Sequence, residues 1–119
     1  MPKRILVLED QEDLYQLLHD LLTFEGYQIH RPAQFSDLVS ELQAHPADAV
    51  IADVNLHDVN GIDLVEELRR QDALKDVYVL LTSGMDYRQE ALQRGANDFL
   101  QKPYMPDELV DLLVQRIGK

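Results

Sequence analysis

Short runs of consecutive apolar residues alternate along this chain with longer segments in which apolar residues are spaced three or four apart. The uninterrupted runs cover residues 5–8, 49–52 and 77–81, and continuous hydrophobicity is typical of parallel strands that are buried on both faces. Shorter apolar segments at residues 27–30 and 99–101 predict two further strands. The pattern therefore predicts five strands.

The segments between and after these strands carry the spacing of one apolar helix face. They predict helices over residues 12–25, 35–45, 62–70, 87–94 and 106–117. Five repeats of strand and helix at close spacing require right-handed crossovers, which place helices on both faces of one parallel sheet. The predicted fold is a single doubly wound α/β domain.

The composition fits one packed domain and narrows the classes of partner. Hydrophobic residues make up 45% of the 119 positions, which is enough for an ordinary core. The sequence contains 11 Lys and Arg against 22 Asp and Glu, so its formal charge is −11. Such an acidic chain repels phosphate backbones, and direct nucleic-acid binding is disfavoured. No cysteine is present and no apolar run suits a signal peptide or a membrane span, which predicts a cytoplasmic protein.

Polar residues that could bind a ligand or take part in a reaction follow the predicted strands. Ligands of open α/β sheets bind outside the carboxyl ends of the strands, so the residues that end each strand are the candidates. They are Glu9, Asp10, Asp53, Thr82 and Lys102. No turn carries the glycine pattern of a nucleotide-binding loop, so a nucleotide site is not indicated.

Three carboxylates, one hydroxyl and one ammonium suit phosphoryl chemistry assisted by a metal. The carboxylates would repel one another unless a cation held them, and Mg²⁺ is the best candidate because it takes few protein oxygens and completes its shell with water and phosphate. One carboxylate could then attack a phosphoryl group and form an aspartyl phosphate. Thr82 and Lys102 supply the hydroxyl and the cation that such a group needs.

The same residues resemble a known family. The acidic pair after the first strand, residues 53–56, Gly61, residues 82–84 and residues 95–103 together look like the receiver domain of two-component response regulators. The resemblance extends over residues 1–119 and implies the flavodoxin-like strand order 2-1-3-4-5.

The resemblance also implies residue roles. Asp53 would be the phosphoacceptor, and Glu9, Asp10, Asp53 and the backbone carbonyl of Asn55 would serve Mg²⁺. Lys102 would precede a cis proline. Three departures stand out: His57 replaces the usual proline, which predicts a less rigid loop; the stretch from Thr82 to Lys102 is short; and Glu9 replaces the commoner aspartate, a longer arm that reaches the metal through water.

The implied function is a phosphorylation-dependent switch rather than an enzyme with an external substrate. The phosphoryl donor would be a sensor histidine kinase or a histidine phosphotransfer protein. Thr82 would move towards the phosphoryl group, and the surface of the fourth helix, fifth strand and fifth helix would be re-set for a downstream protein. A phosphorylation-dependent homodimer is also compatible with this interpretation.

Two other functions stay open at this point. A metal-dependent phosphohydrolase could use Asp53 as its nucleophile, but it would want a second acid two residues later, where Asn55 stands. A docking module that is never phosphorylated would not need the full set of charged site groups. The four histidines lack ligand spacing, which disfavours a zinc site.

Aromatic and apolar residues near Lys102 have two interpretations each. Phe99 is either a core residue or the aromatic side chain that turns inward after phosphorylation in receivers. Tyr104 and Met105 are either partner anchors or ordinary loop residues.

Overall fold

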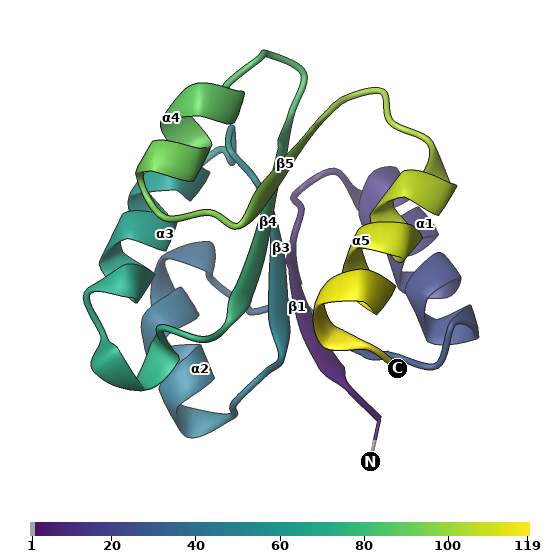
Figure 1. Cartoon of the computed structure of the whole chain (residues 1–119), viewed down its shortest axis with the longest axis horizontal. Helices are drawn as coiled ribbons and strands as arrows, with labels where there is room; N and C mark the ends of the chain where they lie inside the picture. Colours follow the sequence, from purple (N-terminus) through teal and green to yellow (C-terminus); the bar gives the residue numbers. More distant parts are fainter. Residues whose placement is uncertain (1) are drawn as a thin grey trace.

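The computed structural model describes residues 2–119 and shows one parallel sheet between two layers of helices (Figure 1). The strands lie in the order β2-β1-β3-β4-β5, as predicted. Their bounds are β1 (Arg4–Leu8), β2 (Gln28–His30), β3 (Ala49–Asp53), β4 (Tyr78–Ser83) and β5 (Asp98–Gln101). The reversal of strand order between β1 and β3 places the expected ligand edge at the carboxyl ends of these two strands.

Helices cover both faces of the sheet. Their bounds are α1 (Glu12–Phe24), α2 (Leu38–Ala44), α3 (Gly61–Arg69), α4 (Arg88–Gln93) and α5 (Pro106–Ile117). Helices α1 and α5 pack on one face, and α2, α3 and α4 pack on the other (Figure 1). Among the described residues, no helix has both the length and the apolar character needed to cross a membrane.

The two hydrophobic cores explain the unbroken apolar runs. Along β1, Leu6 and Leu8 belong to the core under α2 and α3, whereas Ile5 and Val7 belong to the core under α1 and α5. Successive side chains of a strand point to opposite faces, so a strand covered on both faces must be apolar at every position.

The structure differs from the predicted elements mainly at their ends. The strand predicted over residues 77–81 continues to Ser83, because Thr82 pairs in register with Asp53 and its carbonyl accepts the Val54 amide at 2.8 Å. The second helix begins with a separate 3-10 turn, Phe35–Asp37, a tightening that is common at helix ends. A further 3-10 turn, Asp72–Leu74, was not predicted because three residues are too few to show a period.

Candidate functional site

Lys102 stands at the centre of the candidate site. Its Nζ lies 2.6 Å from Oδ2 of Asp53 and 3.1 Å from Oε1 of Glu9. The carboxyl ends of β1, β3 and β5 deliver these three residues to one edge of the sheet, as the sequence predicted. Glu9 is buried, and its second oxygen accepts the Gln11 amide at 3.2 Å. A bridging ammonium therefore compensates two carboxylates at once.

Burial and hydrogen bonding act in opposite directions on the Lys102 ammonium. Burial alone lowers the pKa of Lys102, but hydrogen bonds to Asp53 and Glu9 outweigh it, so the pKa lies above its ordinary value. The side chain is accordingly charged over the physiological range. The peptide bond between Lys102 and Pro103 is cis, which confirms that expectation.

The second oxygen of Asp53 is held by the loop that follows β3. The Asn55 amide donates to Oδ1 of Asp53 at 2.8 Å. The Asn55 side chain donates to Oγ of Ser83 at 2.9 Å, and the same oxygen accepts the Met85 amide at 3.1 Å. The sequence predicted a role at the metal for the Asn55 carbonyl and showed that Asn55 stands where a phosphohydrolase would want an acid, but it predicted no role for the Asn55 side chain or for Ser83. The structure thus holds both oxygens of the Asp53 carboxylate.

Asp10 contacts a different partner. Its Oδ2 accepts the His57 backbone amide at 2.8 Å and lies 3.2 Å from Nδ1 of His57. Burial raises the pKa of Asp10, but these hydrogen bonds from His57 outweigh it and hold the pKa below its ordinary value. The sequence signalled His57 only as a departure from proline. Proline has no amide hydrogen, so it could not make the backbone contact.

The oxygen donors of this edge have the chemistry that Mg²⁺ prefers. Mg²⁺ is usually held by one or two carboxylates, with water and other oxygens completing its shell. Asp10, Asp53 and the Asn55 carbonyl supply such a set. Within residues 2–119, no group of three or more His, Cys, Asp or Glu side chains is arranged to hold a metal ion. The donor chemistry therefore suits Mg²⁺, while the roles of Asp10, Asp53, Asn55 and Glu9 as metal ligands stay predictions.

Thr82 lies beside Asp53 in the interior, and Phe99 lies in the core on β5. Thr82 is 3% exposed and pairs with Asp53 across β3 and β4. Phe99 is 1% exposed on β5, in the core under α3 and α4, and the Arg88 guanidinium lies 5.7 Å from its ring centroid. The structure therefore shows Phe99 as a core residue in this state.

An apolar groove borders the site on the side of α1. Its volume is about 250 Å³. It is lined by Leu14, Leu17, Leu18 and Leu21 of α1 and by Lys102, Pro103, Tyr104 and Pro106. Burial raises the pKa of Tyr104 in its wall. Leu17 is 57% exposed and Met105, next to the groove in sequence, is 64% exposed, so apolar surface is open to solvent here.

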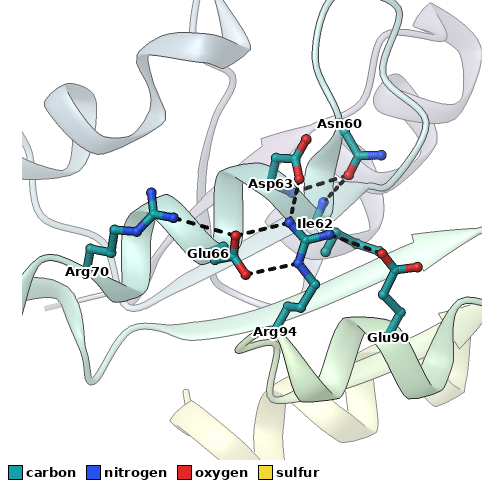
Figure 2. Close-up of polar contacts among 7 residues, drawn as sticks. All are labelled: Asn60, Ile62, Asp63, Glu66, Arg70, Glu90 and Arg94. Atoms are coloured by element: carbon teal, nitrogen blue, oxygen red, sulfur yellow. Dashed lines mark hydrogen bonds and ion pairs between the residues drawn. The ribbon is translucent and has the colours of Figure 1, made fainter.

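An ion-pair network on the opposite side ties α4 to α3 (Figure 2). Arg94, which follows α4, donates to Glu66 through Nε at 3.0 Å and through Nη2 at 3.1 Å. It also contacts Asp63 at 2.6 Å and Glu90 at 3.1 Å. The end of α4 is therefore fixed, whereas its beginning follows directly from the loop after Thr82 and Ser83.

The fold and the site together define a class of protein. They form a flavodoxin-like α/β domain with an acidic, lysine-compensated site at the carboxyl edge of its sheet, a setting suited to cations and phosphoryl groups. The family model of the response regulator receiver domain matches residues 5–114. The chain therefore belongs to the receiver domain family of two-component response regulators, which confirms the resemblance seen in the sequence.

Relatives agree with this assignment. The chain is 30% identical over 115 residues to the chemotaxis protein CheY of Thermotoga maritima, covering 95% of this chain and 96% of CheY. It is 30% identical over 108 residues to the response regulator SaeR of Staphylococcus aureus, covering 89% of this chain and 46% of SaeR. The receiver domain of the sensor histidine kinase PA1611 of Pseudomonas aeruginosa superimposes with a TM-score of 0.87 at 26% identity, with all of both chains covered. That structure has a magnesium ion coordinated in its active site cleft.

Proposed function

We propose that Asp53 accepts a phosphoryl group with Mg²⁺ bound beside it, and that this modification re-sets the surface formed by α4, β5 and α5. Phosphorylation-dependent switching is the general function of the receiver family. The observation that supports the proposal for this chain is the contact of 2.6 Å between Nζ of Lys102 and Oδ2 of Asp53. It gives the acceptor a fixed cation that can stay beside it when negative charge is added.

The transfer needs only groups at this edge of the sheet. A carboxylate oxygen of Asp53 attacks the phosphorus of the donor, a P–O bond forms, and the bond from phosphorus to the donor nitrogen or oxygen breaks. The electron pair of that bond leaves with the donor. Lys102 then holds a phosphoryl oxygen, and the Thr82 hydroxyl donates a hydrogen bond to another.

The proposed metal ligands are Asp10, Asp53 and the Asn55 carbonyl, with Glu9 acting through water. Bound Mg²⁺ would supply positive charge that offsets repulsion between the carboxylates and the incoming phosphoryl group. The magnesium ion in the related PA1611 receiver supports this assignment.

The proposed phosphoryl donor is a protein that carries phosphohistidine, either a sensor histidine kinase or a histidine phosphotransfer protein. Such a protein must contact the surface next to Asp53 for its phosphoryl group to arrive. The apolar groove of α1 is continuous with the site through Lys102 and offers exposed apolar area for that contact. We propose this groove as the docking surface of the donor.

The wider proposal concerns the whole chain. Residues 1–119 would act as one receiver domain in the cytoplasm, whose only catalysis is on its own phosphoryl group. The output would pass to a downstream protein or, after phosphorylation, to a second copy of this chain.

Incubation with acetyl phosphate and MgCl₂, followed by intact-mass spectrometry, tests the proposal. We expect one added phosphoryl group on the wild-type chain and none on Asp53→Asn. Asp37→Asn is the matched control, because Asp37 is exposed and lies before α2. Equal labelling of Asp53→Asn, or labelling that survives a chelator, would exclude this acceptor or its metal requirement. No labelling of the wild type would favour the docking module instead.

A further inference from the structure

His57 reaches across the site to a residue that is 47 positions away in the sequence. Both of its contacts, from the backbone amide at 2.8 Å and from Nδ1 at 3.2 Å, go to the same oxygen, Oδ2 of Asp10. Within the described chain, no other residue donates a hydrogen bond to this carboxylate. Apart from the amide of Asp10 itself, no donor within the described residues therefore competes with another ligand for its second oxygen, Oδ1.

The loop that carries His57 is closed at its base. Asn55 and Asn60 form an isolated antiparallel bridge, and the Gly61 amide donates to the Val54 carbonyl at 2.8 Å. A side chain at Gly61 would overlap the carbonyl oxygen of Asp53, so the loop returns directly beside the strand end. These contacts fix the path of the backbone on both sides of His57.

The far end of the loop is anchored to α3. Oδ1 of Asn60 accepts the amides of Ile62 at 2.8 Å and of Asp63 at 3.2 Å, which caps the first turn of the helix (Figure 2). The same turn is held from outside by the pair between Asp63 and Arg94. His57 therefore projects from a loop that hydrogen bonds anchor at both ends.

We propose that His57 is a positioning residue for the binding of Mg²⁺. His57 holds Oδ2 of Asp10 and leaves Oδ1 to the metal. This inference rests on the proposed function, since it assigns Asp10 to the metal. The same loop also holds Asp53, through the Asn55 amide. One short segment, residues 55–57, thus holds the carboxylates of both proposed ligands, Asp10 and Asp53. Hydrogen bonds from neighbouring groups to metal-ligating carboxylates orient them and strengthen metal binding.

Calorimetric titration of the unphosphorylated chain with Mg²⁺ and with Mn²⁺ tests the inference. His57→Ala keeps the amide contact and loses the imidazole contact, and we expect the dissociation constants of both metals to rise by about tenfold. His57→Asn should recover part of the affinity, because its side-chain amide can also donate. His45→Ala, which removes an exposed histidine at the end of α2, is the matched control and should bind as the wild type does.

Three outcomes would overturn the inference. Unchanged or tighter Mg²⁺ binding by His57→Ala would show that His57 does not position Asp10 for the metal. Loss of Mn²⁺ binding alone would show that the imidazole is itself a ligand. Failure of the wild type to bind either metal would contradict both the inference and the metal part of the proposed function. Metal binding of equal affinity by the wild type and His57→Ala would contradict the inference alone.

A kinetic measurement separates positioning from general damage. In labelling by acetyl phosphate, the Mg²⁺ concentration for the half-maximal rate should rise in His57→Ala by the same factor as the dissociation constant. The rate at saturating Mg²⁺ and the thermal unfolding midpoint without metal should stay at wild-type values. A lower saturating rate with an unchanged Mg²⁺ requirement would contradict the assignment.

Discussion

The ammonium group of Lys102 lies 2.6 Å from Oδ2 of Asp53, although the two residues are 49 positions apart in the sequence. Lys102 follows β5 and Asp53 ends β3, and these strands are not neighbours, since β4 runs between them. The long lysine arm spans β4 and also reaches Oε1 of Glu9 at 3.1 Å. The same ammonium can thus compensate Asp53 before phosphorylation and a phosphoryl oxygen afterwards.

Replacing Lys102 with Ala should separate chemistry from its structural response. We expect Asp53 to acquire phosphate from acetyl phosphate, about tenfold more slowly, because one cation at the acceptor is lost. Addition of beryllofluoride and Mg²⁺ should cause much smaller amide chemical-shift changes over residues 98–105 than in the wild type. A conformational response requires a ligand that interacts differently with the two states, and Lys102 is the proposed source of that difference.

Lys75→Ala is the matched control for this experiment, because Lys75 is exposed in the segment between α3 and β4. It should show wild-type labelling and wild-type shifts. Shifts of wild-type size in Lys102→Ala at saturating beryllofluoride would mean that Thr82 transmits the signal without the lysine.

Asp10→Asn and Thr82→Ala should give different phenotypes. Asp10→Asn removes the charge of a proposed metal ligand, so the Mg²⁺ dissociation constant should rise by about tenfold or more. Thr82→Ala should leave Mg²⁺ affinity nearly unchanged while it reduces the shifts caused by beryllofluoride. Calorimetry and amide spectra measure the two effects separately. An equal loss of Mg²⁺ affinity in both variants would show that the proposed division of roles is wrong.

The hydrophobic pattern was sufficient for the fold. Every strand of the sheet lies within a predicted apolar segment or extends it by one or two residues. The pattern is strongest along β1, β3 and β4, which are buried on both faces and are apolar at most positions. The ends were less predictable. Thr82 and Ser83 continue β4 through pairing with β3 and β5, and that pairing is a tertiary contact which local pattern does not encode.

The site was predictable in its residues but not in its contacts. Parallel strands bring Glu9, Asp53 and Lys102 to one edge, so strand ends alone select them. Which carboxylate His57 holds depends on the path of the loop after Asp53. That path is set by backbone hydrogen bonds, which a sequence does not display.

Leu17→Asp tests the proposed docking groove. The experiment uses a histidine phosphotransfer protein that labels the wild type. Phosphotransfer from it to Leu17→Asp should be slower by about tenfold or more, because the charged side chain removes an apolar contact at the interface. Labelling by acetyl phosphate should be unchanged, since that donor needs no docking. Leu92→Asp, on the exposed face of α4, is the matched control and should transfer normally. Equal slowing with both donors would place the effect in the site rather than in docking.

The network around Arg94 has a pH dependence of its own (Figure 2). Hydrogen bonds from Arg94 to Glu66 are the main cause that holds the pKa of Glu66 below its ordinary value of 4.5. A carboxyl group whose pKa is lower in the folded state stabilises the fold when it is ionised. The contribution of Glu66 is therefore present above its ordinary pKa and is lost as the pH falls through the lowered value.

Glu66→Gln should consequently lower the urea midpoint of unfolding near neutral pH, where Glu66 is charged and paired with Arg94 across α3 and α4. As the pH falls through the lowered pKa of Glu66, the wild-type carboxyl is protonated, so the difference between the two proteins should shrink. Glu67→Gln is the matched control, because Glu67 is the next residue of α3 and is exposed, and its replacement removes the same charge. The urea midpoint of this variant should differ little from that of the wild type at either pH. If the difference in midpoint between Glu66→Gln and the wild type stays the same in acid, the effect arises from packing rather than from the ion pair. Equal midpoints near neutral pH would show that the network does not stabilise the junction of α3 and α4.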